Sequence, residues 1–217
     1  PSALGGAAVA DRGPGAAGGA GGAVPGLGGA ARHGADLICL GSTGDLHRTG
    51  LLRILQPQRW GGMEYDFVSY IDVPMELARG CASTSWNVVN LSIHNWMLAL
   101  YDERAQAEVW GKDPDALIAA GIAYPQGRAR KADGGFVISG KWNFSSGVNI
   151  AEWCMLAVIV RDGERVIDHR MCLLDKSQYE VVDDWHTLGM RGGVSGWARS
   201  SDAHVRAARA GVSVVDG

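Results

Sequence analysis

The sequence has few cysteines, and their arrangement indicates neither a metal site nor a disulfide framework. Its 217 residues include four cysteines, widely spaced and without a C-x-x-C pair. A zinc site needs clustered ligands, and a disulfide-stabilised domain needs a denser cysteine pattern. We therefore expect reduced core side chains at Cys39, Cys81, Cys154 and Cys172.

Excess charge and long apolar runs are also absent. The formal net charge is −3 and the isoelectric point is near 6.1, which gives no electrostatic case for binding nucleic acid or an anionic membrane. No apolar run reaches the roughly 18 residues of a membrane span, and no basic segment followed by an apolar one opens the sequence. These features predict a cytoplasmic protein. Hydrophobic residues make up 47% of the chain, which is enough to build a core.

Residues 1–35 are dominated by glycine and alanine. Such a composition buries too little apolar surface to offset the entropy lost on ordering. Residues 13–18 match G-x-G-x-x-G, but no strand pattern precedes them and no amphipathic helix follows, so we interpret the match as an accident of composition. We expect residues 1–44 to be disordered or to be translated from a shifted reading frame of a G+C-rich gene.

Residues 45–115 carry helical patterns and predict a helical domain. Residues 45–55 place leucines on one face, and Pro57 ends that helix. Residues 64–78 carry apolar side chains at near-helical intervals, and Pro74 is expected to kink or interrupt them.

Two further helices are expected in this domain. Ser83 or Thr84 is suited to cap the first of them. The second is a short helix over residues 103–110, which Gly111 and Pro114 end. The apolar face predicted for the first consists of Trp86, Val89, Ile93, Met97 and Leu100.

From residue 116 onward the pattern changes to strands. Short apolar runs are separated by turn signals at residues 133–135 and 162–163. Helices followed by antiparallel strands give an α+β chain, with a β-domain over residues 116–217. The predicted strands are 117–124, 136–144, 153–160 and 166–174.

Residues 142–147 read Trp-Asn-Phe-Ser-Ser-Gly and lie between two apolar runs. Two aromatic rings beside two hydroxyls suit a planar, polar ring system, because its faces can stack while hydroxyls meet nitrogens and oxygens at its edge. A flavin is such a ring system.

Five ordered blocks stand out between Leu46 and Gly192: Gly50–Leu52 with Pro57–Gly62, Ala78–Trp86, His94–Trp96, Trp142–Gly147 and Leu188–Gly192. In this order they resemble the oxygenase components of two-component, reduced-flavin-dependent aromatic monooxygenases. This family includes the 4-hydroxyphenylacetate 3-hydroxylases and shares the acyl-CoA dehydrogenase fold. The resemblance implies a helical N-terminal domain, an antiparallel β-domain and a homotetramer when full-length. Family members continue into a C-terminal four-helix bundle, so we expect a fragment in which this bundle is missing.

Beyond Gly192 the sequence departs from the family pattern, in which Thr-Gly-Ser and another alternating strand would follow. Here residues 193–199 read Gly-Val-Ser-Gly-Trp-Ala-Arg, and an Arg/Ala-rich tail follows. We expect the segment after residue 192 to be divergent or non-native, and the folded part to run from about Asp45 to about Gly192.

The resemblance also implies roles for individual residues. In the family the residue that matches Trp86 lies at the flavin, the one that matches His94 contacts the phenolic oxygen of the substrate, and the one that matches Ser145 lies at flavin N5. His94 and Ser145 are therefore the implied catalytic residues. The alternative is structural: a buried tryptophan, a hydrogen-bonded core histidine and a local serine turn. The implied flavin-binding residues are Trp86, Trp142, Asn143, Phe144, Ser145 and Ser146. Because side chains alternate along a strand, only some of those in the 142–146 segment can face the ring.

The implied chemistry is hydroxylation of a small aromatic substrate. A separate NAD(P)H-dependent flavin reductase supplies reduced FMN or FAD by diffusion, reaction with O2 gives a C4a-hydroperoxyflavin, and one oxygen atom passes to an aromatic carbon. The protein shields this adduct and holds the substrate. Residues 119–123 read Ala-Ala-Gly-Ile-Ala, where the family often carries hydroxyl residues facing the substrate. Both indolic and phenolic substrates therefore remain open as substrate classes.

Two alternatives remain open at this point. An acyl-CoA dehydrogenase-like flavoenzyme shares the fold, but residues 125–129 lack the Thr-Glu-Pro-like segment of those enzymes. A truncated, non-catalytic remnant would bind no flavin. No metal site is expected, because Asp183, Asp184 and His186 lack a fourth ligand.

Overall fold

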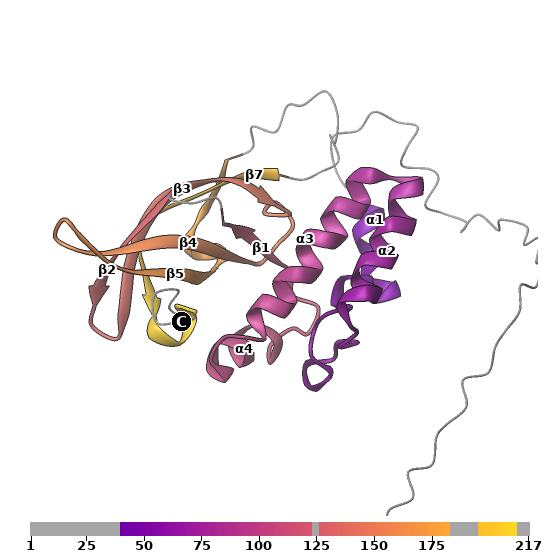
Figure 1. Cartoon of the computed structure of the whole chain (residues 1–217), viewed down its shortest axis with the longest axis horizontal. Helices are drawn as coiled ribbons and strands as arrows, with labels where there is room; N and C mark the ends of the chain where they lie inside the picture. The colour runs from indigo at the N-terminus through magenta and orange to yellow at the C-terminus, as the bar shows by residue number, and fades with distance from the viewer. Residues whose placement is uncertain (1–39, 123–125, 183–194, 212–217) are drawn as a thin grey trace, which may run out of the picture.

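Helices lead into a curled sheet in the computed structural model, which describes residues 40–122, 126–182 and 195–211 (Figure 1). The predicted α+β order is confirmed. The helices are α1 Leu40–Thr49, η2 Leu51–Arg53, η3 Gln58–Trp60, α2 Phe67–Gly80, α3 Ala82–Leu98, α4 Glu103–Trp110, η4 Lys176–Gln178 and η5 Ala207–Arg209. The strands are β1 Ile118–Gly121, β2 Gly127–Ala132, β3 Gly135–Ser146, β4 Trp153–Asp162, β5 Arg165–Asp175, β6 Glu180–Val182 and β7 Ser195–Arg206.

The first predicted helix, over residues 45–55, is two elements. Between α1 and η2, Gly50 adopts a left-handed backbone conformation (φ 74°). Residues other than glycine rarely adopt this conformation. The leucines still point inward, since Leu46, Leu52 and Leu55 are buried. The chain thus keeps the predicted apolar face and turns at Gly50.

Helix α2 is continuous past Pro74. Asp66 caps its N-terminus by accepting a hydrogen bond from the backbone N–H of Ser69 (2.8 Å). The predicted interruption at Pro74 is wrong, because this buried proline lies inside the helix. Its carbonyl accepts a hydrogen bond from Ser85 Oγ of α3 (2.6 Å), which ties the two helices together.

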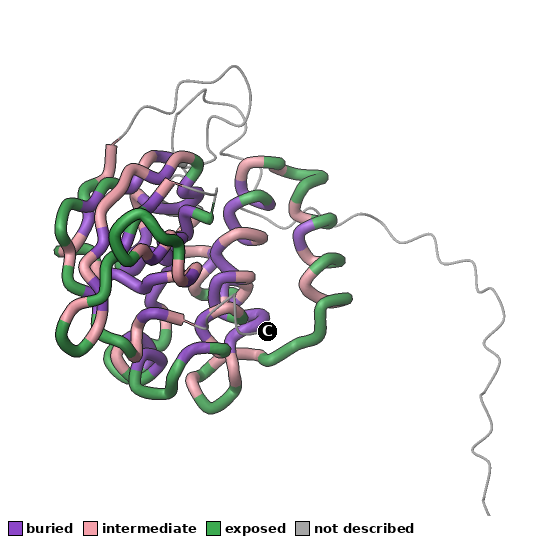
Figure 2. Tube along the Cα trace, turned by 60° about the vertical axis from the view of Figure 1, so that its left-hand side comes forward, coloured by how far each residue is buried: buried purple, intermediate pink, exposed green. Residues whose placement is uncertain are grey.

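Helix α3 lies between α2 and the sheet, and the apolar face predicted for it is wrong (Figures 1 and 2). Trp86 and Leu100 of that face are exposed. The buried side includes polar residues that bond to backbone carbonyls: Ser92 Oγ donates to Leu51 and Asn95 Nδ2 donates to Leu52. Buried polar groups satisfied in this way cost little, so sequence hydrophobicity alone misjudges the face.

The expected N-cap of α3 is also wrong. Ser83 and Thr84 lie inside the helix, and the N-cap position is Cys81, which makes no side-chain capping bond. Helix α4, in contrast, spans the predicted residues 103–110.

The sheet has seven strands among the described residues and is mixed, which corrects the antiparallel expectation. Strand β4 pairs antiparallel with β5 but parallel with both β1 and β2. The reason is the β2–β3 hairpin, which turns at Gly134 (φ 68°). The long strand β3 carries the chain back, so β4 runs in the same direction as β1 and β2. Sequence patterns also missed β2, β6 and β7.

Strand β4 is apolar from Trp153 to Val160, where both of its faces are buried. Cys154 and Leu156 face the core that surrounds Trp142 inside the curl of the sheet. Trp153 and Met155 face a second core, which includes Val109 and Trp110 of α4. Helices contribute to both cores, since Val88 and Leu91 of α3 belong to the first and Val109 and Trp110 of α4 to the second.

Strand β7 corrects the predicted end of the folded part near Gly192. It pairs with both β3 and β6, and Ala198 and Val205 are buried. After it, Arg209 forms ion pairs with Glu108 of α4 and with Asp175 of β5. Residues 195–211 are therefore integral to the fold.

Several predictions concern residues outside the described ranges: the character of residues 1–39, the Leu188–Gly192 block, the last residues of the strand 117–124, and the group Asp183, Asp184 and His186. Among the described helices, none has the length and apolar character that crossing a membrane requires.

Candidate functional site

The end of strand β3 contacts helix α3 through Trp86 and Ser146, which are 60 positions apart. Trp86 Nε1 donates a hydrogen bond to Ser146 Oγ (3.2 Å). Ser146 is buried, whereas Trp86 is 49% exposed. The edge of the indole is thus fixed while much of its surface stays open.

A β-bulge sets the direction of the serines. The β3–β7 pairing is irregular between Trp142 and Ser145, and Phe144 in that gap has a left-handed backbone (φ 59°). Phe144 is 68% exposed. A non-glycine residue in this conformation is strained, and such strain is concentrated at functional sites.

Beyond the bulge the two serines face opposite ways. Ser145 is fully buried and lies beside β1. Its Oγ is so close to Gly121 that a Cβ at that position would lie 3.0 Å from it. Its hydroxyl donates only a long bond, 3.4 Å, to the carbonyl of Trp142. Ser146 faces α3. Opposite directions for successive residues agree with the alternation predicted for this strand.

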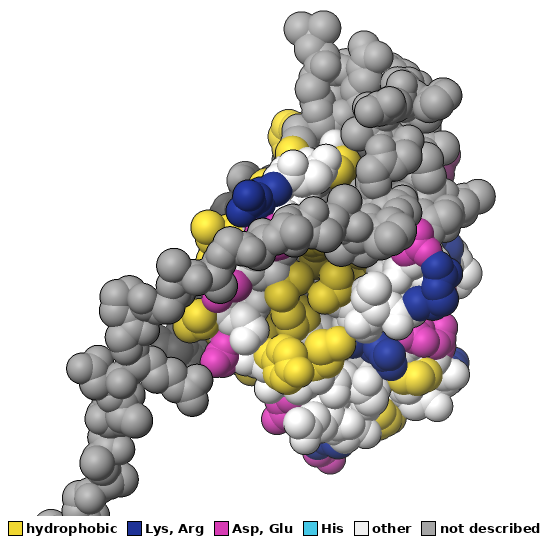
Figure 3. Space-filling view, turned by 90° about the vertical axis from the view of Figure 1, so that its right-hand side faces the viewer, with side chains coloured by type: hydrophobic (Ala, Val, Ile, Leu, Met, Phe, Trp, Pro, Cys, Tyr) yellow, Lys and Arg dark blue, Asp and Glu magenta, His cyan; other side chains and the backbone are white. Residues whose placement is uncertain are grey.

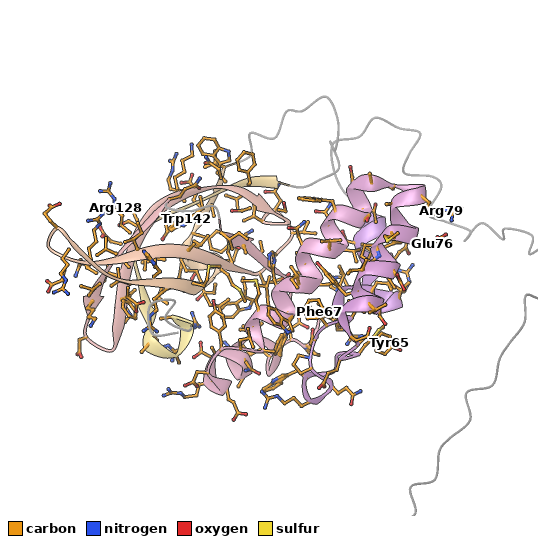
Figure 4. The ribbon with its side chains drawn as sticks, in the orientation of Figure 1. Tyr65, Phe67, Glu76, Arg79, Arg128 and Trp142 are labelled. Carbon is orange, nitrogen blue, oxygen red and sulfur yellow. The ribbon has the colours of Figure 1, made fainter. Side chains whose placement is uncertain are left out.

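Trp142 lies deep in the core (Figure 4). Its indole Nε1 donates to the carbonyl of Ala157 (2.7 Å). The ring fills the space that Gly127 leaves open, since a Cβ there would lie 2.3 Å from the ring. Neither face of Trp142 is exposed, so it supports β3 from behind. Asn143 is half-buried, and its backbone N–H donates to the side-chain carbonyl of Gln126.

His94 lies farther along α3 and is buried. Its Nδ1 lies 2.7 Å from the carbonyl oxygen of Ile118 in β1. A carbonyl only accepts, so Nδ1 carries the proton and Nε2 is left as an acceptor. Burial lowers the pKa of His94 to about 4, although the bond to Ile118 opposes this shift. The imidazole is therefore neutral at pH 7.

Strand β1 connects the two parts of the candidate site. Ile118 bonds to His94, and Gly121 adjoins Ser145. Three residues of strand separate these contacts by about 10 Å. The structure thus brings Trp86, Phe144 and the serines to the end of β3 and places His94 farther along the same helix and strand.

Sequence reasoning missed two residues at this site, Gly121 and Gln126. Gly121 leaves room for both Trp142 and Ser145. A glycine at the end of an apolar strand indicates close backbone approach, so its signal was present. The contact of Gln126 with Asn143 depends on the bulge, which the sequence pattern does not indicate.

The exposed side of α2 carries a stripe of apolar side chains, and Figure 3 shows hydrophobic side chains gathered on this side of the molecule. Tyr65 and Phe67 lie at one end of α2 (Figure 4). Phe67 stacks edge-on against Trp96 of α3. Patches of this kind mark interaction surfaces. The exposed members on and next to α2 are Tyr65, Phe67, Val68, Ile71 and Met75.

Comparisons with known proteins agree with this architecture. Residues 42–113 match the model of the acyl-CoA dehydrogenase N-terminal domain. The crystal structure of 3-HSA hydroxylase from Rhodococcus sp. RHA1 superposes with a TM-score of 0.79 at 35% identity, covering 82% of this chain and 46% of that one. The acyl-CoA dehydrogenase-like fold is confirmed.

Curated relatives are monooxygenase components. The flavin-dependent monooxygenase oxygenase subunit HsaA of Mycobacterium tuberculosis is 40% identical over 148 residues, which are 68% of this chain and 37% of the relative. The oxygenase component of the FADH(2)-dependent resorcinol hydroxylase of a Rhizobium species is 40% identical over 153 residues, 69% of this chain and 37% of the relative. The chain thus spans less than half the length of these relatives. Its homologues are the oxygenase components of two-component flavin-dependent monooxygenases, as the sequence motifs predict, and residues 42–113 match an acyl-CoA dehydrogenase N-terminal domain.

Proposed function

We propose that this chain is the flavin-facing part of a monooxygenase that uses reduced flavin and O2 to hydroxylate a small phenolic or indolic substrate. The observation that carries the proposal is the half-exposed indole of Trp86, fixed by Ser146 at the end of β3, the strand on which Phe144 is also exposed. Two open aromatic surfaces next to hydroxyls fit a flat, polar ring system.

The residues present fit a flavin. Trp86 and Phe144 offer exposed aromatic surface. The role of Ser145 at flavin N5 stays a prediction, because its weakly held hydroxyl is fully buried on the face of β3 opposite Ser146. Trp142 and Asn143 act from behind by holding the shape of β3. When bound, reduced FMN or FAD would supply activated oxygen from O2.

His94 is proposed to hold the substrate. Its proton lies on Nδ1 in the bond to Ile118, so a neutral Nε2 can accept the hydroxyl proton of a phenol. Such a bond raises the electron density of the aromatic ring, which favours attack by an electrophilic oxygen. A charged imidazolium could not accept this proton, so burial of His94 prepares it for the task.

The substrate class follows from strand β1. Ala119 and Ala120 are buried and carry no hydroxyl. They belong to different cores on opposite faces of β1, so this strand supplies no hydroxyl on either side, and a site without such hydrogen-bond partners discriminates weakly between a phenol and an indole. We therefore keep both ring types in the proposal.

The proposed partners are a separate NAD(P)H-dependent flavin reductase and, in a full-length protein, further copies in a homotetramer. The exposed apolar stripe of α2 supports subunit or domain contacts on that side. A cytoplasmic location is proposed from the free thiols: Cys81, Cys154 and Cys172 form no disulfide.

The test is an oxygenation assay. The chain is incubated with NADH, a flavin reductase, FMN or FAD, catalase and a panel of phenols and indoles under ¹⁸O2. We expect ¹⁸O in a hydroxylated product of at least one substrate. Binding of reduced flavin without any hydroxylated product would reduce the chain to a remnant of the enzyme.

The second candidate is an acyl-CoA dehydrogenase-like flavoenzyme, which the match of residues 42–113 to that domain keeps open. An assay of acyl-CoA thioester oxidation with an artificial electron acceptor separates the two. Turnover there, with no oxygenation, would favour the second candidate.

A further inference from the structure

We infer that Ser146 is a positioning residue for Trp86 and does not contact the flavin itself. This inference rests on the proposed function for the identity of the ring that Trp86 faces. The pairing of the two side chains stands on the structure alone: Ser146 Oγ accepts the indole N–H of Trp86 over 3.2 Å.

The burial of the two partners is opposite. Ser146 is buried at the end of β3, while Trp86 on α3 is half-exposed. A tryptophan on a helix surface can rotate about two side-chain bonds, and ordering it for a ligand costs entropy at the moment of binding. A hydrogen bond from its edge to a buried acceptor lowers that cost because it holds the indole before the ligand arrives.

The bulge at Phe144 gives Ser146 this direction. Without the irregular pairing between Trp142 and Ser145, the period of two along the strand would place Ser146 on the inner face with Trp142. With one residue inserted, Ser145 takes the inner position beside Gly121 and Ser146 faces α3. The strained residue and the Trp86–Ser146 bond are therefore parts of one arrangement.

No competing partner holds the indole N–H. The bond to Ser146 is the hydrogen bond of Trp86 Nε1 within the described residues, and the backbone carbonyl of Trp86 is separately engaged by Asn90 Nδ2 (2.7 Å). Removing the Ser146 hydroxyl would release the indole without unfolding the helix turn that carries it.

The first test measures the environment of the Trp86 indole by ¹⁹F NMR in the absence of flavin. The chain is labelled with 5-fluorotryptophan, and the ¹⁹F resonance of Trp86 is assigned from its loss in Trp86→Phe. We expect Ser146→Ala to shift and broaden this resonance and Ser145→Ala to leave it in place. An unmoved Trp86 resonance in Ser146→Ala overturns the inference.

The second test is a double-mutant cycle on binding of reduced FMN, measured by anaerobic titration. Trp86→Phe keeps a ring and removes the N–H donor, so it is matched to Ser146→Ala. Each variant should weaken binding about three- to tenfold, and the double variant should be no weaker than the poorer single variant. Additive losses would mean that Ser146 contacts the flavin directly and would overturn the inference. Should the wild-type chain bind no reduced flavin, the proposed function fails, and the ¹⁹F spectrum alone decides the role of Ser146.

Discussion

Nδ1 of His94 on helix α3 lies 2.7 Å from the carbonyl oxygen of Ile118 in strand β1, and this contact fixes both the tautomer and the charge of a buried histidine. The carbonyl accepts a hydrogen bond from the protonated Nδ1, which leaves Nε2 as an acceptor. Burial holds the pKa at about 4, so the neutral form dominates at physiological pH. The hydrogen bond between His94 and Ile118 thus joins α3 to β1 and also fixes the tautomer of the imidazole.

His94 should make the protein sensitive to acid. Its pKa falls from 6.5 to about 4 on folding, so between these values the unfolded chain binds a proton that the folded chain does not. Stability from this group is complete above pH 6.5 and is lost as the pH falls through 4. At about 1.4 kcal/mol per pKa unit the loss approaches about 3 kcal/mol.

His94→Asn keeps an N–H donor for Ile118 and removes the titration. Urea unfolding at several pH values between 4 and 7 should show a smaller decline for the variant than for wild type. Identical declines would mean that His94 does not titrate in this range.

Phe144 should trade stability for function. Its left-handed backbone (φ 59°) costs about 1–2 kcal/mol, which glycine avoids, while the unfolded state of a glycine variant gains about 0.5–1 kcal/mol of entropy. Because the ring is mostly exposed, little burial is lost. We expect Phe144→Gly to raise the free energy of unfolding by up to about 1 kcal/mol and to weaken binding of reduced flavin.

Asp202→Gly is the matched control, since Asp202 is exposed and has a similar backbone (φ 51°) on β7. It should be stabilised by a similar amount with unchanged flavin affinity. Equal flavin affinity in wild type and Phe144→Gly would remove Phe144 from the site.

Arg209 should hold residues 195–211 to the helices. Its side chain is only 11% exposed, pairs with Glu108 and Asp175, and lies 4.8 Å from the ring centroid of Trp153. Removing Arg209 takes away the partner of Asp175 and one of the two partners of Glu108, which Arg206 also pairs. Arg209→Met should therefore lower the free energy of unfolding by about 2–3 kcal/mol in urea.

The control is Arg79→Met, because Arg79 and Glu76 form an exposed pair on α2 (Figure 4). Its effect should stay within about 0.5 kcal/mol. A small loss in Arg209→Met would show that η5 contributes little to the stability of the fold.

The sequence predicted the elements whose pattern depends on local chemistry. Gly111 and Pro114 correctly marked the end of α4, and continuous apolar runs correctly marked β3, β4 and β5. Strand β2 was missed because Gly-Arg-Ala-Arg-Lys-Ala offers only alanine as an apolar signal, although Ala129 is buried. Strand β7 was missed because its sequence departs from the family pattern, whereas its pairing with β3 supplies the order.

The site was predicted in part, for a related reason. The motif match indicated Trp86, His94 and the 142–147 segment, and the structure brings Trp86 onto Ser146. Their burial was not predictable, since it depends on partners distant in sequence. Ser92 and Asn95 are buried because carbonyls of η2 accept their hydrogen bonds, and Trp142 is buried because Gly127 leaves room for its ring. Roles for Ser145, Trp142 and Asn143 at a flavin stay predictions.

The central claim, that the exposed indole of Trp86 is where reduced flavin binds, is tested most directly by anaerobic titration with reduced FMN. Wild type is compared with Trp86→Ala and with Trp96→Ala, which removes another exposed indole from the same helix. The account predicts saturable binding by wild type, a loss of about tenfold or more in Trp86→Ala, and an unchanged affinity in Trp96→Ala. Absence of binding by wild type, or equal losses in the two variants, would contradict it.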